Sequence, residues 1–133
     1  MRLFLDTNVI ISAMLFPNGR VAAFLRDAIE NHTVVIGEYV IEELRTVFRR
    51  KFPERTADLE EFILEFSYET VQTPIRSETG DAPVVRDPKD NPILESAIRS
   101  NCDYLITGDK DLTELEGVKH PKIVNPGRFL DRQ

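Results

Sequence analysis

Four acidic residues stand where apolar segments of the chain begin or end: Asp6, Glu43, Asp90 and Asp109. Carboxylate oxygens are the ligands that hard divalent cations such as Mg²⁺ and Mn²⁺ prefer. Four carboxylates brought together without a cation would repel one another and raise each other's pKa. The sequence therefore predicts a Mg²⁺ or Mn²⁺ site assembled from residues that are far apart in the chain.

The first acid gives the clearest signal. The apolar run at residues 3–5 stops at Asp6, which suggests a buried strand that ends in a carboxylate. In open parallel sheets, ligands bind at the carboxyl ends of the strands. A desolvated carboxylate there must be paired, protonated or bound to a metal ion. We therefore expect Asp6 at the centre of the site.

The second acid is selected by helical geometry. At about 100° per residue, Glu43 lies at the edge of the apolar arc of its helix, roughly 40° from Val47, whereas Glu42 points away. Glu43 can thus reach a cleft beside the core. Alternatively, it pairs with Arg50, two turns further along the same edge, or extends into water.

The third acid has two interpretations of equal weight. When the apolar face of the helix at residues 92–100 is extended backward, Asp90 falls on that face, which favours metal binding. Asp90 or Asn91 could instead be only the N-cap, with Pro92 in the first turn. Asp87, which precedes Pro88, is expected to be a turn residue.

The fourth acid repeats the pattern of the first. The apolar residues 104–106 are followed by Thr107, Gly108, Asp109, Lys110 and Asp111, so carboxylates again appear where a strand ends. We expect Asp109 to be the ligand. Asp111 suits the N-cap of the following helical turn, or a residue that supports the ligand.

Length and composition limit the classes of protein. The 133 residues fit a single domain, 1–133, and no segment is long enough to span a bilayer. The lone Cys102 cannot form an internal disulfide, which agrees with a cytoplasmic location, and isolated His32 and His120 give no zinc pattern. The net charge of −6 is unfavourable for nucleic acid, but four of these charges belong to the predicted metal site.

Apolar periodicity predicts alternating strands and helices, and therefore an α/β fold with a mostly parallel sheet covered on both faces. A loop is expected at residues 77–83. The helix near residues 59–66 is strongly apolar, so it contributes either to the core or to a homodimer interface. The residues concerned are Leu59, Phe62, Ile63, Phe66 and Tyr68. The expected strands cover residues 3–5, 33–36, 70–73, 104–107 and 122–124, and the expected helices residues 21–29, 40–48, 59–66 and 92–100, with a helical turn after residue 111.

Taken together, these motifs resemble the PIN-domain nucleases, and among them the VapC-like ribonucleases that are the toxins of bacterial and archaeal toxin-antitoxin pairs. The resemblance covers essentially the whole chain. It rests on Asp6-Thr7-Asn8, Glu43-Leu44, Asp90 with Ile93 and Ala97, and residues 107–112. One departure is Gly37-Glu38, where the family often has Ser.

The resemblance implies a three-layer α/β/α sandwich, a Mg²⁺ or Mn²⁺ site, cleavage of single-stranded RNA, an antitoxin partner and frequently a homodimer. It implies that the four acids are both catalytic and metal ligands. It also implies that Thr7 and Asn8 support the first acid and that the Thr107 hydroxyl lies beside the last. We expect Arg50 to contact an RNA phosphate.

Two other functions compete with this interpretation. A haloacid-dehalogenase-type phosphatase needs a second Asp two residues after the first, where this chain has Asn8. A non-catalytic PIN-like module that binds RNA or protein has the same fold. Such a module would be marked by loss of one or more acids, and this chain retains all four.

Overall fold

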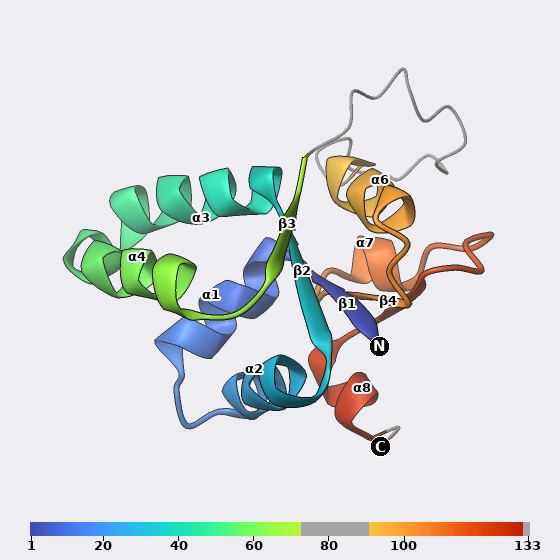
Figure 1. Cartoon of the computed structure of the whole chain (residues 1–133), viewed down its shortest axis with the longest axis horizontal. Coiled ribbons are helices and arrows are strands. Elements are labelled where there is room, and N and C mark those ends of the chain that lie inside the picture. The colour runs from blue at the N-terminus through green and yellow to red at the C-terminus, as the bar shows by residue number, and fades with distance from the viewer. Residues whose placement is uncertain (73–90, 132–133) are drawn as a thin grey trace.

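The computed structural model describes residues 1–72 and 91–131. Within these residues the sheet has five strands in the order β3-β2-β1-β4-β5, and every neighbouring pair is parallel. Figure 1 shows β3, β2 and β1 near the centre of the molecule. β1 is therefore central, between β2 and β4. The strands are β1 (Arg2–Leu5), β2 (Thr33–Gly37), β3 (Glu69–Val71), β4 (Tyr104–Ile106) and β5 (Lys122–Val124).

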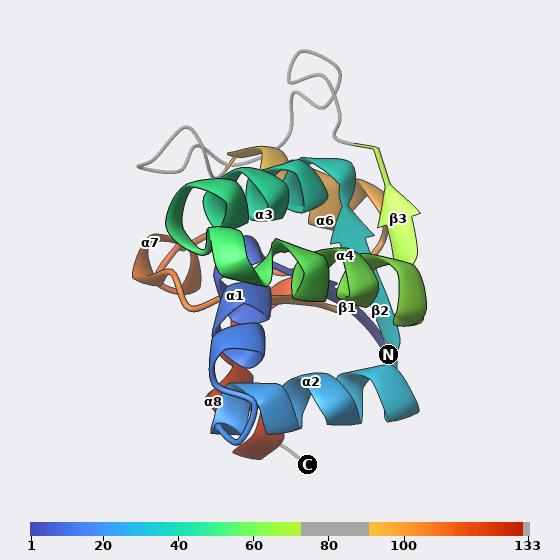
Figure 2. The ribbon, with the colours of Figure 1, turned by 90° about the vertical axis from the view of Figure 1, so that its left-hand side faces the viewer.

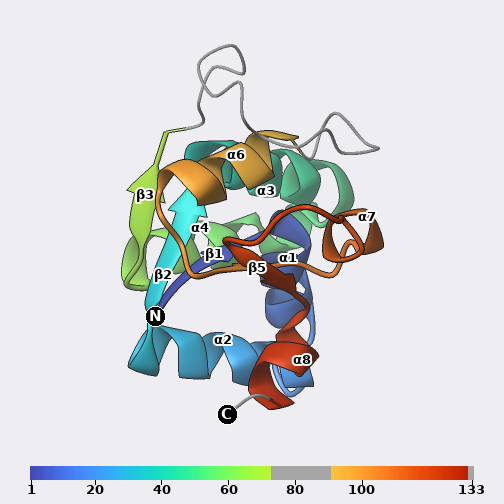
Figure 3. The ribbon, with the colours of Figure 1, turned by 90° about the vertical axis from the view of Figure 1, so that its right-hand side faces the viewer.

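Helices cover both faces of this sheet, which confirms the predicted α/β/α sandwich. Figure 2 looks onto α1, α2, α3 and α4, and Figure 3, from the opposite side, looks onto α6 and α7. The helices are α1 (Thr7–Leu15), α2 (Arg20–Asn31), α3 (Glu38–Lys51), α4 (Thr56–Glu65), α6 (Asn91–Arg99), α7 (Lys110–Thr113) and α8 (Pro126–Asp131), with a 3-10 turn η1 (Pro53–Arg55) before α4.

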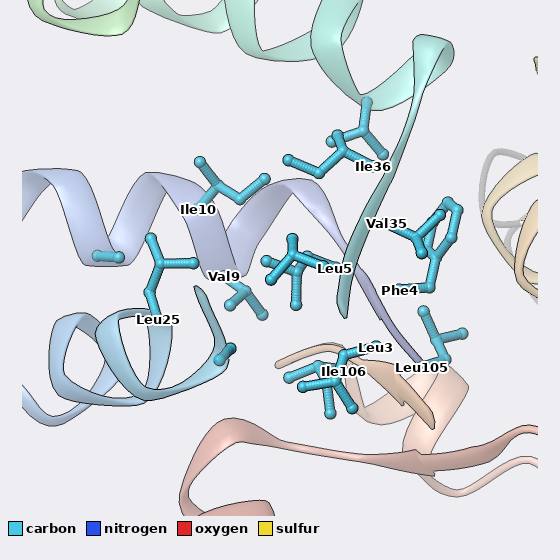
Figure 4. Packing of buried hydrophobic residues seen from close by; sticks show 14 of the residues in the cluster. Leu3, Phe4, Leu5, Val9, Ile10, Leu25, Val35, Ile36, Leu105 and Ile106 are labelled. Atoms are coloured by element: carbon cyan, nitrogen blue, oxygen red, sulfur yellow. The ribbon is translucent and has the colours of Figure 1, made fainter. Parts of the chain in front are cut away.

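The core is built around β1, whose residues Leu3, Phe4 and Leu5 are fully buried. Figure 4 shows Phe4 beside Val35 on one side of the strands and Leu5 with the α1 side chains on the other. A strand that is covered on both faces needs apolar residues at every position, not at alternate ones. The continuous apolar run at residues 3–5 therefore has its physical explanation in the central place of β1.

Two helices were not predicted from the sequence. α1 begins at Thr7, directly after Asp6, whose side chain accepts the Thr7 N–H at 2.7 Å and caps the helix. The short α8 packs Phe129 edge-to-face against Phe24 and Tyr104. The predicted strand at residues 70–73 is β3, shifted one residue toward the N-terminus. Thr73 and the loop expected at residues 77–83 lie outside the described residues.

Some apolar side chains of helix α4 and its C-terminal end are buried in the core, and others are exposed. Leu59 and Phe62 are buried in the core, so they are not available to a second copy of the chain. Phe66 is 45% exposed, and Leu64, which the sequence analysis did not single out, is 83% exposed. Within residues 1–72 and 91–131, no single helix is both long and apolar enough to cross a membrane.

Candidate functional site

Three of the predicted acids follow three adjacent strands. Asp6 comes directly after β1, Glu43 lies in the second turn of α3, which follows β2, and Asp109 lies in the turn after β4. Since β2, β1 and β4 are neighbours and parallel, their carboxyl ends lie at one edge of the sheet. The charges of Glu43 and Asp109 both act on Asp6. Asp90 lies outside the described residues.

Asp6 is a buried carboxylate, with only 5% of the residue exposed. Desolvation is the main cause that raises its pKa above the usual value, and the charges of Glu43 and Asp109 raise it further. Hydrogen bonds from Thr107 and from the Thr7 N–H act in the opposite direction because they stabilise the charged form. The net result is a raised pKa, so ionisation of Asp6 is less favourable than that of an exposed Asp, and a nearby cation would favour it.

Thr107 connects the first and last acids of the site. Its buried hydroxyl donates to Asp6 Oδ2 at 2.7 Å and accepts the backbone N–H of Asp109 at 3.0 Å. One oxygen atom thus fixes the Asp6 side chain relative to the Asp109 backbone.

Asn8 makes a second connection across the same edge. Its Nδ2 donates to Asp6 Oδ2 at 3.1 Å, and its Oδ1 accepts the N–H of Gly108 at 2.9 Å. A Cβ at Gly108 would lie only 3.3 Å from Asn8 Oδ1, so a side chain there would press on this contact. The structure therefore places Thr7, Asn8 and Thr107 in contact with Asp6, and their contribution to a reaction stays a prediction.

The N-cap of α7 is Asp109, and the expectation that Asp111 caps this turn was wrong. Asp109 Oδ1 accepts the backbone N–H of Asp111 at 2.9 Å. The helix begins at Lys110, two residues earlier than expected, so the N–H of Asp111 is among the donors that need a cap. Asp109 consequently caps α7 with one oxygen, while Asp111 is partly buried within the first turn.

Glu42 and Glu43 differ as helical geometry predicted. Glu42 is exposed, whereas Glu43 is partly buried. Arg50 is exposed and forms no ion pair with Glu43 within the described part of the chain, so that alternative is not observed. Of the nearby basic residues, Arg45 pairs with Glu60 and Arg55 with Asp58.

The side chains at this edge offer oxygen atoms, which are the kind of ligand that a hard cation prefers. Asp6 accepts three hydrogen bonds, whereas an ionised carboxylate has about four acceptor sites, so one site on Oδ1 is left. The Thr7 hydroxyl belongs to a residue that is 4% exposed and has no hydrogen-bond partner in the described part of the chain. Among residues 1–72 and 91–131, however, no three His, Cys, Asp or Glu side chains lie close enough together to hold an ion.

Gly37, which with Glu38 occupies the place where the family often has Ser, is constrained by the core. A Cβ on Gly37 would lie 3.1 Å from the ring of Phe4, which is fully buried and cannot easily move. Gly37 is the N-cap of α3 and provides no side-chain cap. The departure therefore removes a possible polar contact at the start of α3 and leaves the three acids in place.

Comparison with known proteins agrees with this architecture. The fold is similar to VapBC2 from Rickettsia felis bound to a promoter DNA fragment (TM-score 0.68, 20% identity, covering 94% of this chain and 98% of that one). It is also similar to DNA-bound VapBC from Salmonella typhimurium (TM-score 0.62, 19% identity, covering 95% and 98%). No curated protein matches the chain. The model of the PIN domain matches residues 2–111, and the chain therefore belongs to the PIN domain family.

Proposed function

We propose that this protein is a metal-dependent endoribonuclease that cleaves single-stranded RNA and is the toxin of a toxin-antitoxin pair. The observation that carries the proposal is the placement of Asp6, Glu43 and Asp109 after three adjacent parallel strands, with Asp6 buried and its pKa raised. A fold alone does not license an activity, because one fold hosts many functions. A buried carboxylate with a raised pKa beside two other acids is, in contrast, typical of a functional site.

We propose Asp6, Glu43, Asp90 and Asp109 as the residues that hold Mg²⁺ or Mn²⁺. When bound, such a cation lowers the pKa of the attacking water and stabilises charge on the leaving oxygen of a phosphodiester. The protein's own part is to hold the ligands still. Thr107 and Asn8 do this for Asp6 through the hydrogen bonds described above. Arg50, exposed near the end of α3, would bind an RNA phosphate.

An antitoxin is proposed as the protein partner, because the two similar structures are both VapBC complexes. A suitable surface is an apolar pocket of about 410 Å³ between α1, α2 and α4, whose lining includes Met14, Phe62 and Phe66. The exposed Leu64 and Phe66 also support a homodimer through α4. Light scattering at micromolar concentration tests the homodimer, and a strict monomer would exclude it.

A non-catalytic module that binds RNA or protein is the second candidate. It has the same fold as the nuclease, and a fold alone does not establish catalysis. The two candidates differ in one measurable property. Only the nuclease would cleave RNA and lose that cleavage when a single carboxylate is replaced.

The test compares labelled single-stranded RNA incubated with purified wild type, Asp6→Asn, Asp90→Asn and Glu42→Gln. We expect cleavage in Mg²⁺ or Mn²⁺ and none in EDTA, since the reaction depends on the cation. Removing one ligand should lower the rate by about two orders of magnitude or more, whereas exposed Glu42 should tolerate replacement. Equal residual cleavage by wild type and Asp6→Asn would indicate a contaminating nuclease and favour the binding module.

A further inference from the structure

A second pocket, of about 370 Å³, opens directly beside the acidic edge. On the side of the acids it is lined by Asn8, Gly108 and Asp109, and its remaining walls are Val9, Ser12, Val21 and Pro126. These residues come from α1, the start of α2, the turn after β4 and the start of α8. Asp109 and Asn8 thus belong both to this pocket and to the proposed catalytic site.

The chemistry of the lining indicates what the pocket can hold. None of its lining residues is Lys, Arg or His, and Asp109 is acidic, so a phosphate would not be stabilised there. Partly buried Val21 and buried Pro126 form an apolar part of the lining. Ser12 lies one helical turn from Asn8 on the same side of α1, and its hydroxyl forms no hydrogen bond with the residues that the structure describes. A neutral group with an apolar face and a polar edge fits this combination.

We propose that this pocket is a nucleoside subsite, which receives one unstacked nucleoside next to the cleaved phosphate. The inference rests on the proposed function. In the proposed reaction the cleaved phosphate lies at the cation that Asp6 and Asp109 would hold, and it carries a nucleoside on each side, so one of the two lies next to the pocket. The base packs against Val21 and Pro126 while the Ser12 hydroxyl bonds a polar edge of the base or ribose. Recognition of single-stranded RNA commonly uses bases that are splayed out in this way.

The test uses Val21→Trp to fill the pocket, Ser12→Ala to remove the Ser12 hydroxyl, and Ala23→Trp as a matched control. Ala23 is exposed on α2 and does not line the pocket. Cleavage of an RNA library with a randomised single-stranded region gives both the rate constants and the base preference at each position. We expect Val21→Trp to raise KM about tenfold, because the loss of one base-stacking contact typically weakens binding by about that factor. It should also reduce the base preference at one position beside the cleaved bond. Ser12→Ala should alter the base preference at that same position, and Ala23→Trp should behave as wild type.

Binding without cleavage gives an independent readout. In the Asp6→Asn background, Val21→Trp should weaken the affinity for labelled single-stranded RNA about tenfold, and Ala23→Trp should not. If Val21→Trp and Ser12→Ala both keep the wild-type base preference, KM and affinity, the subsite is wrong while ribonuclease activity stands. If the wild type cleaves no better than Asp6→Asn, the proposed reaction fails, and the binding comparison still decides whether RNA occupies this pocket. Should Val21→Trp fail to fold, Ser12→Ala decides.

Discussion

The hydroxyl of Thr107 donates a 2.7 Å hydrogen bond to Asp6 Oδ2, although the two residues are 101 positions apart in the sequence. The bond is possible because β1 and β4 are neighbouring parallel strands that end side by side, with Leu5 opposite Ile106. The same hydroxyl accepts the backbone N–H of Asp109. The geometry of two acids in the proposed site therefore depends on a side chain that is itself uncharged.

Replacing Thr107 by Val should weaken both the site and the fold. The isosteric change leaves the Asp109 N–H without its acceptor and removes a donor from a buried carboxylate, at a cost of about 2 kcal/mol. That corresponds to a fall in Tm of roughly 6–10 °C for a chain of this size. Cleavage should fall as well, because Asp6 is held less firmly.

Thr107→Ser is the control, because it keeps the hydroxyl. It should restore most of the lost activity and much of the lost Tm in melts followed by circular dichroism. A Val variant as active as the Ser variant would show that this hydrogen bond does not position Asp6.

Metal binding should stabilise the wild type and not Asp6→Asn. A cation that binds only the folded chain raises stability by mass action, by about 2.7 kcal/mol at 100 times its Kd. Loss of one carboxylate at the buried centre of the site should remove most of this gain. Thermal melts of both proteins with EDTA, Mg²⁺ and Mn²⁺ measure the effect, with Glu42→Gln as the control. An unchanged wild-type midpoint at saturating cation would contradict the proposed site.

The raised pKa of Asp6 gives a defined pH dependence in EDTA. The folded chain holds this proton more tightly than the unfolded chain, in which the Asp pKa has its usual value of 3.8. The contribution of Asp6 to stability is therefore present below pH 3.8 and is lost as the pH rises through the folded pKa. Asp6→Asn cannot ionise, so its Tm relative to wild type should increase by a few degrees from pH 4 to pH 7. A constant difference across this range would argue against a raised pKa.

The sequence was sufficient to predict strands β1, β2 and β4 because each contains a short run of consecutive apolar residues, whereas β3 is mostly polar and exposed and begins one residue before its predicted start. It did not reveal α1, since Val9, Ile10 and Ile11 follow β1 so closely that no change of apolar periodicity separates them. The decisive local signal was Asp6, which caps α1. Asp6, which was predicted as a metal ligand, is thus also a helix cap, and Asp109 likewise caps α7.

The hydrogen bonds that link the acids could not be predicted from the sequence alone. Thr107 and Asn8 were expected near the site only by resemblance to a family. The actual bonds depend on the register of β1 against β4, which a single sequence does not specify. Leu64 was missed for a different reason, because an exposed apolar side chain on an amphipathic helix breaks the pattern by which core residues are recognised.

Gly37→Ala should destabilise the chain without affecting its response to metal. The added Cβ would lie 3.1 Å from the ring of Phe4, which is fully buried. We expect a loss of about 1–2 kcal/mol, in the range of overpacked cores. Chemical denaturation measures the loss, and Gly117→Ala is unsuitable as a control because its φ of 86° disfavours any side chain. If Gly37→Ala is as stable as wild type, Phe4 can move and the departure from Ser at this position has another cause.

The adjacent acids Glu42 and Glu43 are a matched pair of residues for testing whether α3 contributes a ligand to the proposed metal site. Both are Glu residues in the second turn of the same helix, but only Glu43 is partly buried and acts electrostatically on Asp6. Glu43→Gln should therefore lower cleavage about a hundredfold and weaken the stabilisation by Mn²⁺, whereas Glu42→Gln should change both by less than about twofold. Neither change should alter helix content, because Gln and Glu have similar helix propensities. Equal effects of the two variants on activity would remove Glu43 from the proposed metal ligands and leave Asp6, Asp90 and Asp109 to hold the cation.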